Sequence, residues 1–194
     1  MLPPYKDITL VEAGVDEAGR GCLAGSLFAA AVILPKDFQH PLLNDSKKMS
    51  EANRYRLRDI IIENALAWAV AEVTAEEIDT INILNATFLA MNRAIEKLKI
   101  KPDKLLIDGN RFRTDLTTAY ECIVGGDGKF ASIAAASVLA KTFRDDYIIA
   151  LSKDYPEYHW DKNKSYGTLD HRKAIAQYGY TPLHRKSFKL KNLR

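Results

Sequence analysis

Four acidic residues follow short apolar stretches of the sequence: Asp16, Glu17, Asp108 and Asp127. Each stretch has the length and residue types of a β-strand, and the strand ends of an α/β sheet form a common crevice for ligands. A single Asp at such a position is more often a turn or cap residue, so the argument depends on the set. Carboxylates gathered in one crevice repel each other unless a cation neutralises them, and oxygen ligands favour Mg²⁺ or Mn²⁺ over zinc. The pattern therefore predicts a carboxylate site for divalent ions.

Other catalytic chemistries find little support in the sequence. His159, His171 and His184 lack the spacing of a metalloprotease, and neither a G-x-S-x-G elbow nor a P-loop occurs. Cys22 and Cys122 are far apart and outside any paired motif, so neither a disulfide framework nor a cysteine zinc site is indicated. Two isolated cysteines fit a reducing cytoplasm, which is the location that we expect.

The elements that must position these residues can be read from the apolar pattern. Stretches of strand length predict five strands, at 8–15, 25–34, 65–73, 105–108 and 120–124. Helical spacing predicts helices at 45–59, 76–98, 131–151 and 169–178. Three leading strands followed by helix, strand, strand and helix predict an α/β fold with a mixed sheet. Small residues in the 131–151 helix are expected to let it pack closely on the sheet, and we assign its alanine-rich run to packing.

Length and charge limit the class of protein. The chain has 194 residues, 47% of them hydrophobic, which is enough for one core, so we expect a single domain over 1–194. The net charge of +3 permits a nucleic-acid partner without requiring one. Positive charge is concentrated after Trp160, in a segment that is either a phosphate-binding surface or a solvated tail. The start of the chain lacks the apolar run of a secretory signal, and we expect no membrane segment.

Six ordered blocks of the sequence resemble ribonuclease HII. The string DEAGRG at 16–21, followed by Leu23-Ala24-Gly25, is similar to the opening signature of that family. The likeness continues along nearly the whole chain, through NDSKK at 44–48, DG at 108–109, GD at 126–127 with SIAAASVLAK at 132–141 and RD at 144–145, YGT at 166–168 with His171, and HRKSF at 184–188. Type HIII, which usually carries an extra N-terminal domain, fits less well, because only fifteen residues precede Asp16 and Arg20 stands between two glycines.

The resemblance implies a fold and an activity. The fold is a ribonuclease H-like mixed sheet flanked by helices, with a small helical or irregular basic extension from about residue 155 to 194. The implied enzyme is an endonuclease that hydrolyses the RNA strand of RNA–DNA hybrids and cuts 5′ of single ribonucleotides in duplex DNA, leaving 5′-phosphate and 3′-hydroxyl ends. Its targets are expected to be replication primers and misincorporated ribonucleotides. Asp16, Glu17, Asp108 and Asp127 are the implied catalytic set, holding two Mg²⁺ or Mn²⁺ ions about 3.5–4 Å apart.

The resemblance also implies substrate contacts. Gly19, Arg20 and Gly21 suit the sensing of a 2′-hydroxyl, since glycines let the backbone approach a sugar and Arg20 can engage a phosphate. A tight hairpin also needs glycine, so the triplet alone leaves both interpretations open. Tyr166 is expected to pack on the sugar that follows the ribonucleotide. Contacts to phosphates, each with a solvated-surface alternative, are expected from Asn44, Ser46 and Lys47 and from some of the residues Lys164, Thr168, His171, Arg185 and Lys186.

Three further positions need comment. Cys22 stands where the family usually has proline and Ser165 where it usually has glycine, which we expect to alter loop rigidity and the approach of the backbone to substrate. Asp145 is an alternative fifth participant in the reaction, but it lies well inside the 131–151 helix, and we interpret it as a structural salt-bridge or cap residue.

Rival functions remain. A nuclease of the same general fold that acts on branched or double-stranded DNA would use the same carboxylates. A non-catalytic hybrid-binding module would gain nothing from negative charge beside a phosphate, and a small-molecule phosphatase would leave the basic C-terminal third unexplained. We expect a monomer that binds RNA–DNA hybrids and ribonucleotide-containing DNA. A replication-clamp contact through the tail at 189–194 is left open.

Overall fold

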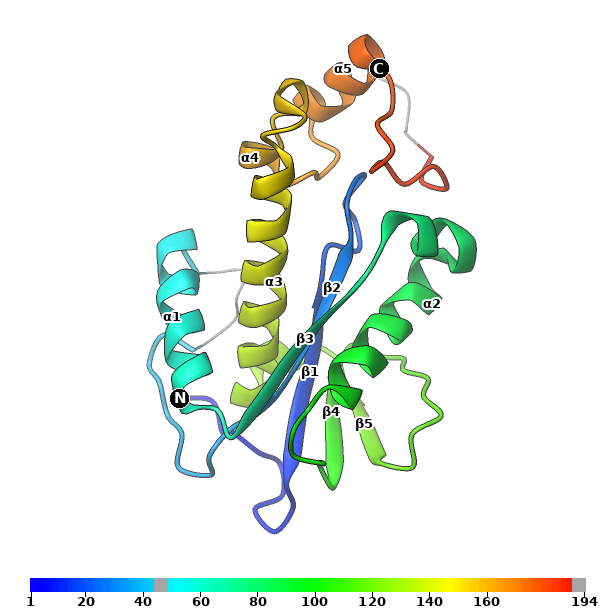
Figure 1. The fold of residues 1–194 in the computed structure, drawn as a ribbon. Coiled ribbons are helices and arrows are strands. Elements are labelled where there is room, and N and C mark those ends of the chain that lie inside the picture. Colours follow the sequence, from blue (N-terminus) through cyan, green and yellow to red (C-terminus); the bar gives the residue numbers. More distant parts are fainter. Residues whose placement is uncertain (44–48, 190–194) are drawn as a thin grey trace.

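The protein is described by a computed structural model that covers residues 1–43 and 49–189. Its centre is a five-stranded sheet in the order β3-β2-β1-β4-β5 (Figure 1). The strands are β1 (Glu12–Ala18), β2 (Leu27–Ile33), β3 (Ala67–Val73), β4 (Lys104–Asp108) and β5 (Ala119–Ile123). β1, β2 and β3 pair antiparallel, whereas β4 pairs parallel with both β1 and β5. The predicted α/β fold with a mixed sheet is therefore confirmed.

Helices cover both faces of the sheet. In Figure 1, α1 and α3 lie on one face and α2 lies on the other. The helices are α1 (Glu51–Asn64), α2 (Ala75–Glu96), α3 (Ala131–Leu151), α4 (Trp160–Asn163) and α5 (Leu169–Tyr178), with short 3₁₀ helices η2 (Gly126–Gly128) and η3 (Pro156–Tyr158). β2 is buried along its whole length because alternate residues pack against opposite layers: Ala29 and Ala31 face α2, and Ala30 and Val32 face α3.

Small residues bring α3 close to the sheet, as predicted. The run from Ala134 to Ala140 is buried throughout. Gly14 of β1 lies against the start of this helix, where a Cβ atom would come within 2.2 Å of the Ser132 carbonyl carbon. Any larger residue at position 14 would push α3 away from β1, so this glycine sets the distance between the two elements that carry the site.

The first strand differs from its prediction at both ends. β1 begins at Glu12 instead of residue 8, because the Asp7 side chain accepts a hydrogen bond from the Thr9 backbone N–H (2.9 Å) and forms a turn there. It then continues through Asp16 and Glu17 to Ala18. Its ladder with β2 extends to Ala18, whereas its ladder with β4 stops at Val15. The two carboxylates therefore lie inside the strand, beyond the point where β4 pairs with it.

Other elements also depart from their predicted bounds. α1 runs from Glu51, after a Ser50 cap whose hydroxyl accepts from Asn53 N–H at 3.3 Å, instead of spanning 45–59. Residues 44–48 of that predicted helix lie outside the described residues. α2 is interrupted at Asn82, whose backbone is non-helical (φ 66°, ψ 164°). Asp127 lies in η2 after β5, not at the strand end itself.

The C-terminal segment packs on the end of α3 and on the loop between β1 and β2. Trp160 is fully buried there, beside Tyr158, Ile148 and Ala24. In Figure 1, α4 lies beside the upper end of α3, and α5 lies beyond that end, at the top. η3 and α4 were not predicted, because their apolar residues form no periodic run. Within the described ranges, no helix has the length and apolar character needed to cross a membrane.

Candidate active site

Strand register places Asp16 beside Asp108. The last pair between β1 and β4 is Val15 with Ile107, and these two Asp residues come next along the parallel strands, about 4.8 Å apart in backbone spacing. Both side chains face α3. Asp16 shares a strand face with Gly14, which lies against α3, and Asp108 shares one with Leu106, which packs on Ile133 of α3. A carboxylate pair therefore forms at the edge of the sheet, under α3.

The surroundings of Asp16 disfavour its charge. The residue is 6% exposed. Burial raises its pKa well above the usual value, and the nearby charges of Glu17 and Asp108 raise it further, while hydrogen bonds from the Ser137 hydroxyl and the Glu17 N–H (2.7 Å) oppose the change. Burial also raises the pKa of Glu17, although Arg20 partly offsets this through a contact of 3.2 Å. The site thus holds more negative charge than it can stabilise alone.

Ser137 is a residue that the sequence interpretation missed. It lies in the small-residue run of α3 that we assigned to packing, yet its hydroxyl group reaches the Asp16 carboxylate. The available signal was that Ser137 is the one hydroxyl within the run 134–140.

Asp108 and Asp127 are linked through η2. The Gly126 N–H donates to Asp108 Oδ1 at 2.7 Å, and Asp127 is the next residue, 5% exposed. A Cβ atom at Gly126 would come within 2.5 Å of Ile133 Cδ1 and 3.3 Å of Asp108 Oδ1, so a larger residue would require the Ile133 side chain or η2 to move. η2 is therefore held against the end of β4, and Asp127 directly follows the residue that contacts Asp108.

The donor set fits a hard divalent cation in kind. It consists of carboxylate oxygens, which suit Mg²⁺ or Mn²⁺, and a cation would oppose the burial and the neighbouring charges that raise the pKa of Asp16. In residues 1–43 and 49–189, however, no group of three or more His, Cys, Asp or Glu side chains is already arranged as a metal cage. The structure places Asp16 and Asp108 on adjacent strands, with Glu17 next to Asp16 in sequence and Asp127 linked to Asp108 through η2. For all four carboxylates to contact the same ions, their side chains must move closer together.

The loop after β1 brings Gly19, Arg20 and Gly21 next to the carboxylates. Gly19 has φ +96°, and a Cβ atom there would lie 2.1 Å from Nε of the buried Arg144. Arg20 and Gly21 are exposed. The positive φ and the contact with Arg144 each disfavour a side chain at position 19. Gly21, by contrast, has open space around it.

Two predicted phosphate contacts are corrected by the structure. Arg185 is 1% exposed, and its guanidinium donates to carbonyl oxygens of Gly19, Arg20 and Gly25. His171 is fully buried, with Nδ1 2.9 Å from the Tyr166 carbonyl oxygen and Nε2 accepting from the Trp160 indole at 2.9 Å. Both side chains use their polar atoms inside the protein, so they support the loops around the site instead of lying on its surface.

The remaining predicted contacts divide into three groups. Tyr166, Thr168 and Lys186 are exposed, and Tyr166 is 40% exposed with the Lys141 ammonium 5.7 Å from its ring. The Thr168 hydroxyl also accepts from His171 N–H (3.2 Å) and so caps α5. Lys164 is mostly buried and lies 3.6 Å from Glu51. The third group, at 44, 46 and 47, lies outside the described residues.

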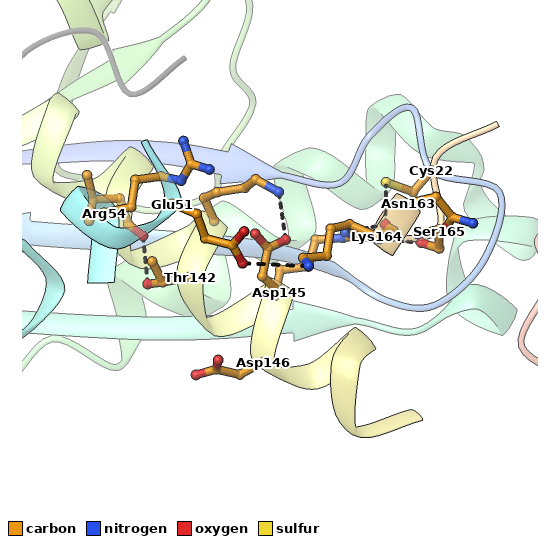
Figure 2. A network of polar contacts seen from close by, with 12 residues as sticks. Cys22, Glu51, Arg54, Thr142, Asp145, Asp146, Asn163, Lys164 and Ser165 are labelled. Atoms are coloured by element: carbon orange, nitrogen blue, oxygen red, sulfur yellow. Dashed lines mark hydrogen bonds and ion pairs between the residues drawn. The ribbon is translucent and has the colours of Figure 1, made fainter. Parts of the chain in front are cut away.

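The two departures from the family pattern meet at one joint (Figure 2). Ser165 is buried in a left-handed conformation (φ 61°), where its hydroxyl donates to the Ala24 carbonyl oxygen and accepts from Arg144, both at 2.8 Å. The Cys22 thiol lies 3.7 Å from the carbonyl oxygen of Lys164, and Cys22 forms a backbone bridge with Tyr166. The serine hydroxyl thus ties the segment that carries Tyr166 to the loop after β1.

Asp145 has the structural role that we expected. It is 2% exposed and forms an i,i+4 ion pair with Lys141 at 2.6 Å. Asp79 of α2 is a further residue that sequence reasoning missed: its carboxylate accepts from the N–H groups of Lys186 (2.8 Å) and Ser187 (2.9 Å). A lone Asp on a helix gives no sequence signal for such a contact.

Comparison with known proteins identifies the family. The family model of ribonuclease HII matches residues 13–191. Ribonuclease HII of Phocaeicola vulgatus is 61% identical over 190 residues, which cover 98% of this chain and 94% of that protein. Ribonuclease H2 of Pyrococcus horikoshii OT3 superposes with a TM-score of 0.76 at 26% identity, covering 92% of this chain and 93% of that chain. The fold is also shared with an Archaeoglobus fulgidus structure, a PCNA:RNase HII complex, with a TM-score of 0.77 at 24% identity over 95% of this chain and 98% of that chain. The chain therefore belongs to the ribonuclease HII family, and it is an endoribonuclease of the ribonuclease H class, which hydrolyses the RNA strand of RNA–DNA hybrids.

Proposed function

We propose that this enzyme cuts long RNA–DNA hybrids and also cuts on the 5′ side of single ribonucleotides in duplex DNA, leaving 5′-phosphate and 3′-hydroxyl ends. One observation carries the proposal: the Asp16–Asp108 pair lies on adjoining strands, and β1 leads from Asp16 directly into the loop with Gly19, Arg20 and Gly21. Hydrolytic and sugar-sensing groups are thereby held within one short stretch of backbone.

Asp16, Glu17, Asp108 and Asp127 are the proposed ligands of two Mg²⁺ or Mn²⁺ ions. When bound, such ions lower the pKa of a water nucleophile and stabilise the leaving 3′-oxygen. The carboxylates must be ionised to hold them, so ion binding displaces the protons that the raised pKa of Asp16 favours. Ser137 donates a hydrogen bond to Asp16, which favours the ionised form of this carboxylate.

Residues around the carboxylates are proposed to read the substrate. The exposed Tyr166 ring offers a flat apolar face for the sugar that follows the ribonucleotide, and the backbone at Gly19–Gly21 approaches the 2′-hydroxyl. Thr168, Lys186 and Lys164, together with Asn44, Ser46 and Lys47, are proposed to contact phosphates. We further propose one catalytic domain over 1–194 with a basic substrate-binding extension from about residue 155, acting as a cytoplasmic monomer. A clamp contact like that of the A. fulgidus complex belongs among these proposals.

A labelled DNA duplex with one ribonucleotide, compared with an all-DNA duplex, tests the proposed activity. Both are incubated with the wild type and Asp16→Asn in Mg²⁺, in Mn²⁺ and in chelator. We expect a single cut 5′ of the ribonucleotide, dependent on metal and lost in Asp16→Asn. Equal cutting of the all-DNA duplex would favour the DNA nuclease, and binding of hybrid without any cut in either metal would favour the binding module.

A further inference from the structure

Arg185 holds the carbonyl side of the sugar-sensing loop. Its Nη1 donates to the carbonyl oxygens of Gly19 (2.8 Å) and Arg20 (3.1 Å), and its Nε and Nη2 donate to that of Gly25 at 3.0 and 2.9 Å. In the described part of the chain, no ion pair includes this guanidinium. The guanidinium therefore donates its hydrogen bonds to three backbone carbonyl oxygens of one loop.

Peptide geometry then fixes the direction of two N–H groups. In a trans peptide the C=O and N–H bonds point in opposite directions, and the described chain has no cis peptide bond. The Gly19 carbonyl shares its peptide with the Arg20 N–H, and the Arg20 carbonyl shares its peptide with the Gly21 N–H. Since both carbonyls are turned inward to Arg185, both N–H groups point away from it.

These two N–H groups are open to a ligand. Among the residues that the structure describes, neither has a hydrogen-bond acceptor. Gly21 is exposed, and no heavy atom lies within 4 Å of the place where its Cβ would be. Two consecutive backbone donors in such a turn form a concave site that suits an oxygen acceptor.

A second buried arginine adds to the positive field behind the loop. Arg144 is fully buried against Gly19, donates to Ser165 Oγ and to the carbonyl oxygen of Lys164, and keeps its Nε without a hydrogen-bond partner in the described structure. A carbonyl that accepts from a cation polarises its peptide and makes the attached N–H a stronger donor. Both arginines therefore favour an electronegative atom on the outer side of the loop.

We propose that Arg185 is a positioning residue for ribose recognition: it fixes and polarises the peptides of Gly19 and Arg20 so that the Arg20 and Gly21 N–H groups bind the 2′-hydroxyl oxygen of the ribonucleotide. This inference rests on the proposed function and extends it. A buried side chain that does not contact the substrate would then determine the preference for ribose over deoxyribose.

Equilibrium binding gives the test. The background is Asp16→Asn, so that substrate is not consumed, and the ligands are a DNA duplex with one ribonucleotide and the matched all-DNA duplex, in Mg²⁺. Arg185→Met and Arg185→Lys are compared with Lys186→Met, the exposed neighbour. Arg185→Lys keeps the positive charge, but a single ammonium group cannot replace the three guanidinium nitrogens that donate to these carbonyl oxygens. This variant also provides the test if Arg185→Met does not fold.

We expect the affinity ratio of the ribonucleotide duplex to the all-DNA duplex to fall about tenfold in both Arg185 variants, with the all-DNA affinity changed less than about twofold. Lys186→Met should lower both affinities together and leave the ratio unchanged, because a phosphate contact carries no sugar information. An unchanged ratio in folded Arg185→Lys, or an equal loss for both duplexes, would assign Arg185 to the fold alone and overturn the proposal. If Asp16→Asn with Arg185 intact shows no preference for the ribonucleotide duplex, the proposed function is overturned, and this inference with it.

Discussion

The buried carboxyl group of Asp16 makes the site costly to fold without metal. Burial, followed by the charges of Glu17 and Asp108, raises its pKa, so the folded protein binds a proton there more tightly than the unfolded chain does. The stabilising effect of that proton is present at low pH and is lost as pH rises through the raised pKa. Above the raised pKa the ionised group therefore reduces the free energy of unfolding, although the proposed reaction needs this group ionised.

Asp16→Asn is accordingly expected to abolish cleavage and yet stabilise the metal-free protein. In chelator near pH 7.5 the melting temperature should rise by about 2–6 °C, for a gain of about 1–2 kcal/mol. Saturating Mn²⁺ should raise the melting temperature of the wild type but not of the variant. Asp161→Asn is an exposed control and should change neither the melting temperature in chelator nor its rise in Mn²⁺. A variant less stable than the wild type in chelator would contradict the assignment of repulsion to this carboxyl.

Gly19 and Gly21 provide a matched pair for the loop. Gly19→Ala places a Cβ at φ +96° and against the Arg144 side chain, so we expect a loss of about 2–4 kcal/mol in the free energy of unfolding and a large loss of activity. Gly21→Ala meets no atom within 4 Å and should change stability by less than about 0.5 kcal/mol. Urea unfolding of both variants decides this, and equal destabilisation would be inconsistent with the described loop.

Single residue types predict the site only in part. Motif and spacing predict the acidic set only as a set, because a single Asp after an apolar strand is more often a turn or cap residue. Arg185 and His171 were predicted to lie on the surface, since basic side chains in a basic segment are usually solvated. Their burial follows from long-range packing of the C-terminal segment on the loop at 19–25, which no local pattern reveals.

At the level of elements, helices with strong local signals were predicted best. α3 and α5 have the predicted bounds, because Thr168 caps α5 and Gly179 ends it with φ +82°. The end of β1 was wrong because its length is set by pairing with β2, which is a tertiary property. The interruption of α2 was likewise missed: Asn82 accepts from the N–H groups of Leu84 and Asn85, which restarts the helix.

α2 also anchors the segment that carries Lys186 and Arg185. Asp79→Ala removes the hydrogen bonds from Lys186 N–H and Ser187, so the 184–188 segment loses its link to the helix. We expect KM for a hybrid substrate to rise about three- to tenfold with a smaller change in kcat, because ordering that segment then accompanies binding. Glu76→Ala, one turn earlier and exposed, is the control. Steady-state kinetics showing a lower kcat at unchanged KM would place Asp79 in the chemical step instead.

Across the whole molecule, a buried histidine pair joins the C-terminal segment to the rest of the fold. His184 Nδ1 accepts from Thr181 N–H at 2.9 Å, so its Nε2 carries the proton and donates to His171 Nε2 at 3.2 Å. His171 Nε2 also accepts from Trp160, and its Nδ1 donates to the Tyr166 carbonyl oxygen. Each ring is thus held in one neutral tautomer, and a further proton on His171 Nε2 would face two donors.

The pair should make the stability of the protein depend on pH in the direction opposite to Asp16. Burial, and repulsion between the two rings when both are protonated, lower the pKa of His184 to about 4, whereas an unfolded histidine titrates near about 6.5. The stability contributed by the neutral His184 ring is complete above about pH 6.5 and is lost as pH falls toward 4, by up to about 3 kcal/mol.

His184→Gln should lower the free energy of unfolding at about pH 7.5, and by progressively less below about pH 6.5, because the variant lacks this titration. Urea unfolding in chelator across this range measures the difference, with His159→Asn as an exposed control that tolerates the left-handed backbone at φ 52°. Parallel pH profiles for the wild type and His184→Gln would show that His184 titrates normally, and the neutral pair would then have no part in holding the C-terminal segment on the loop.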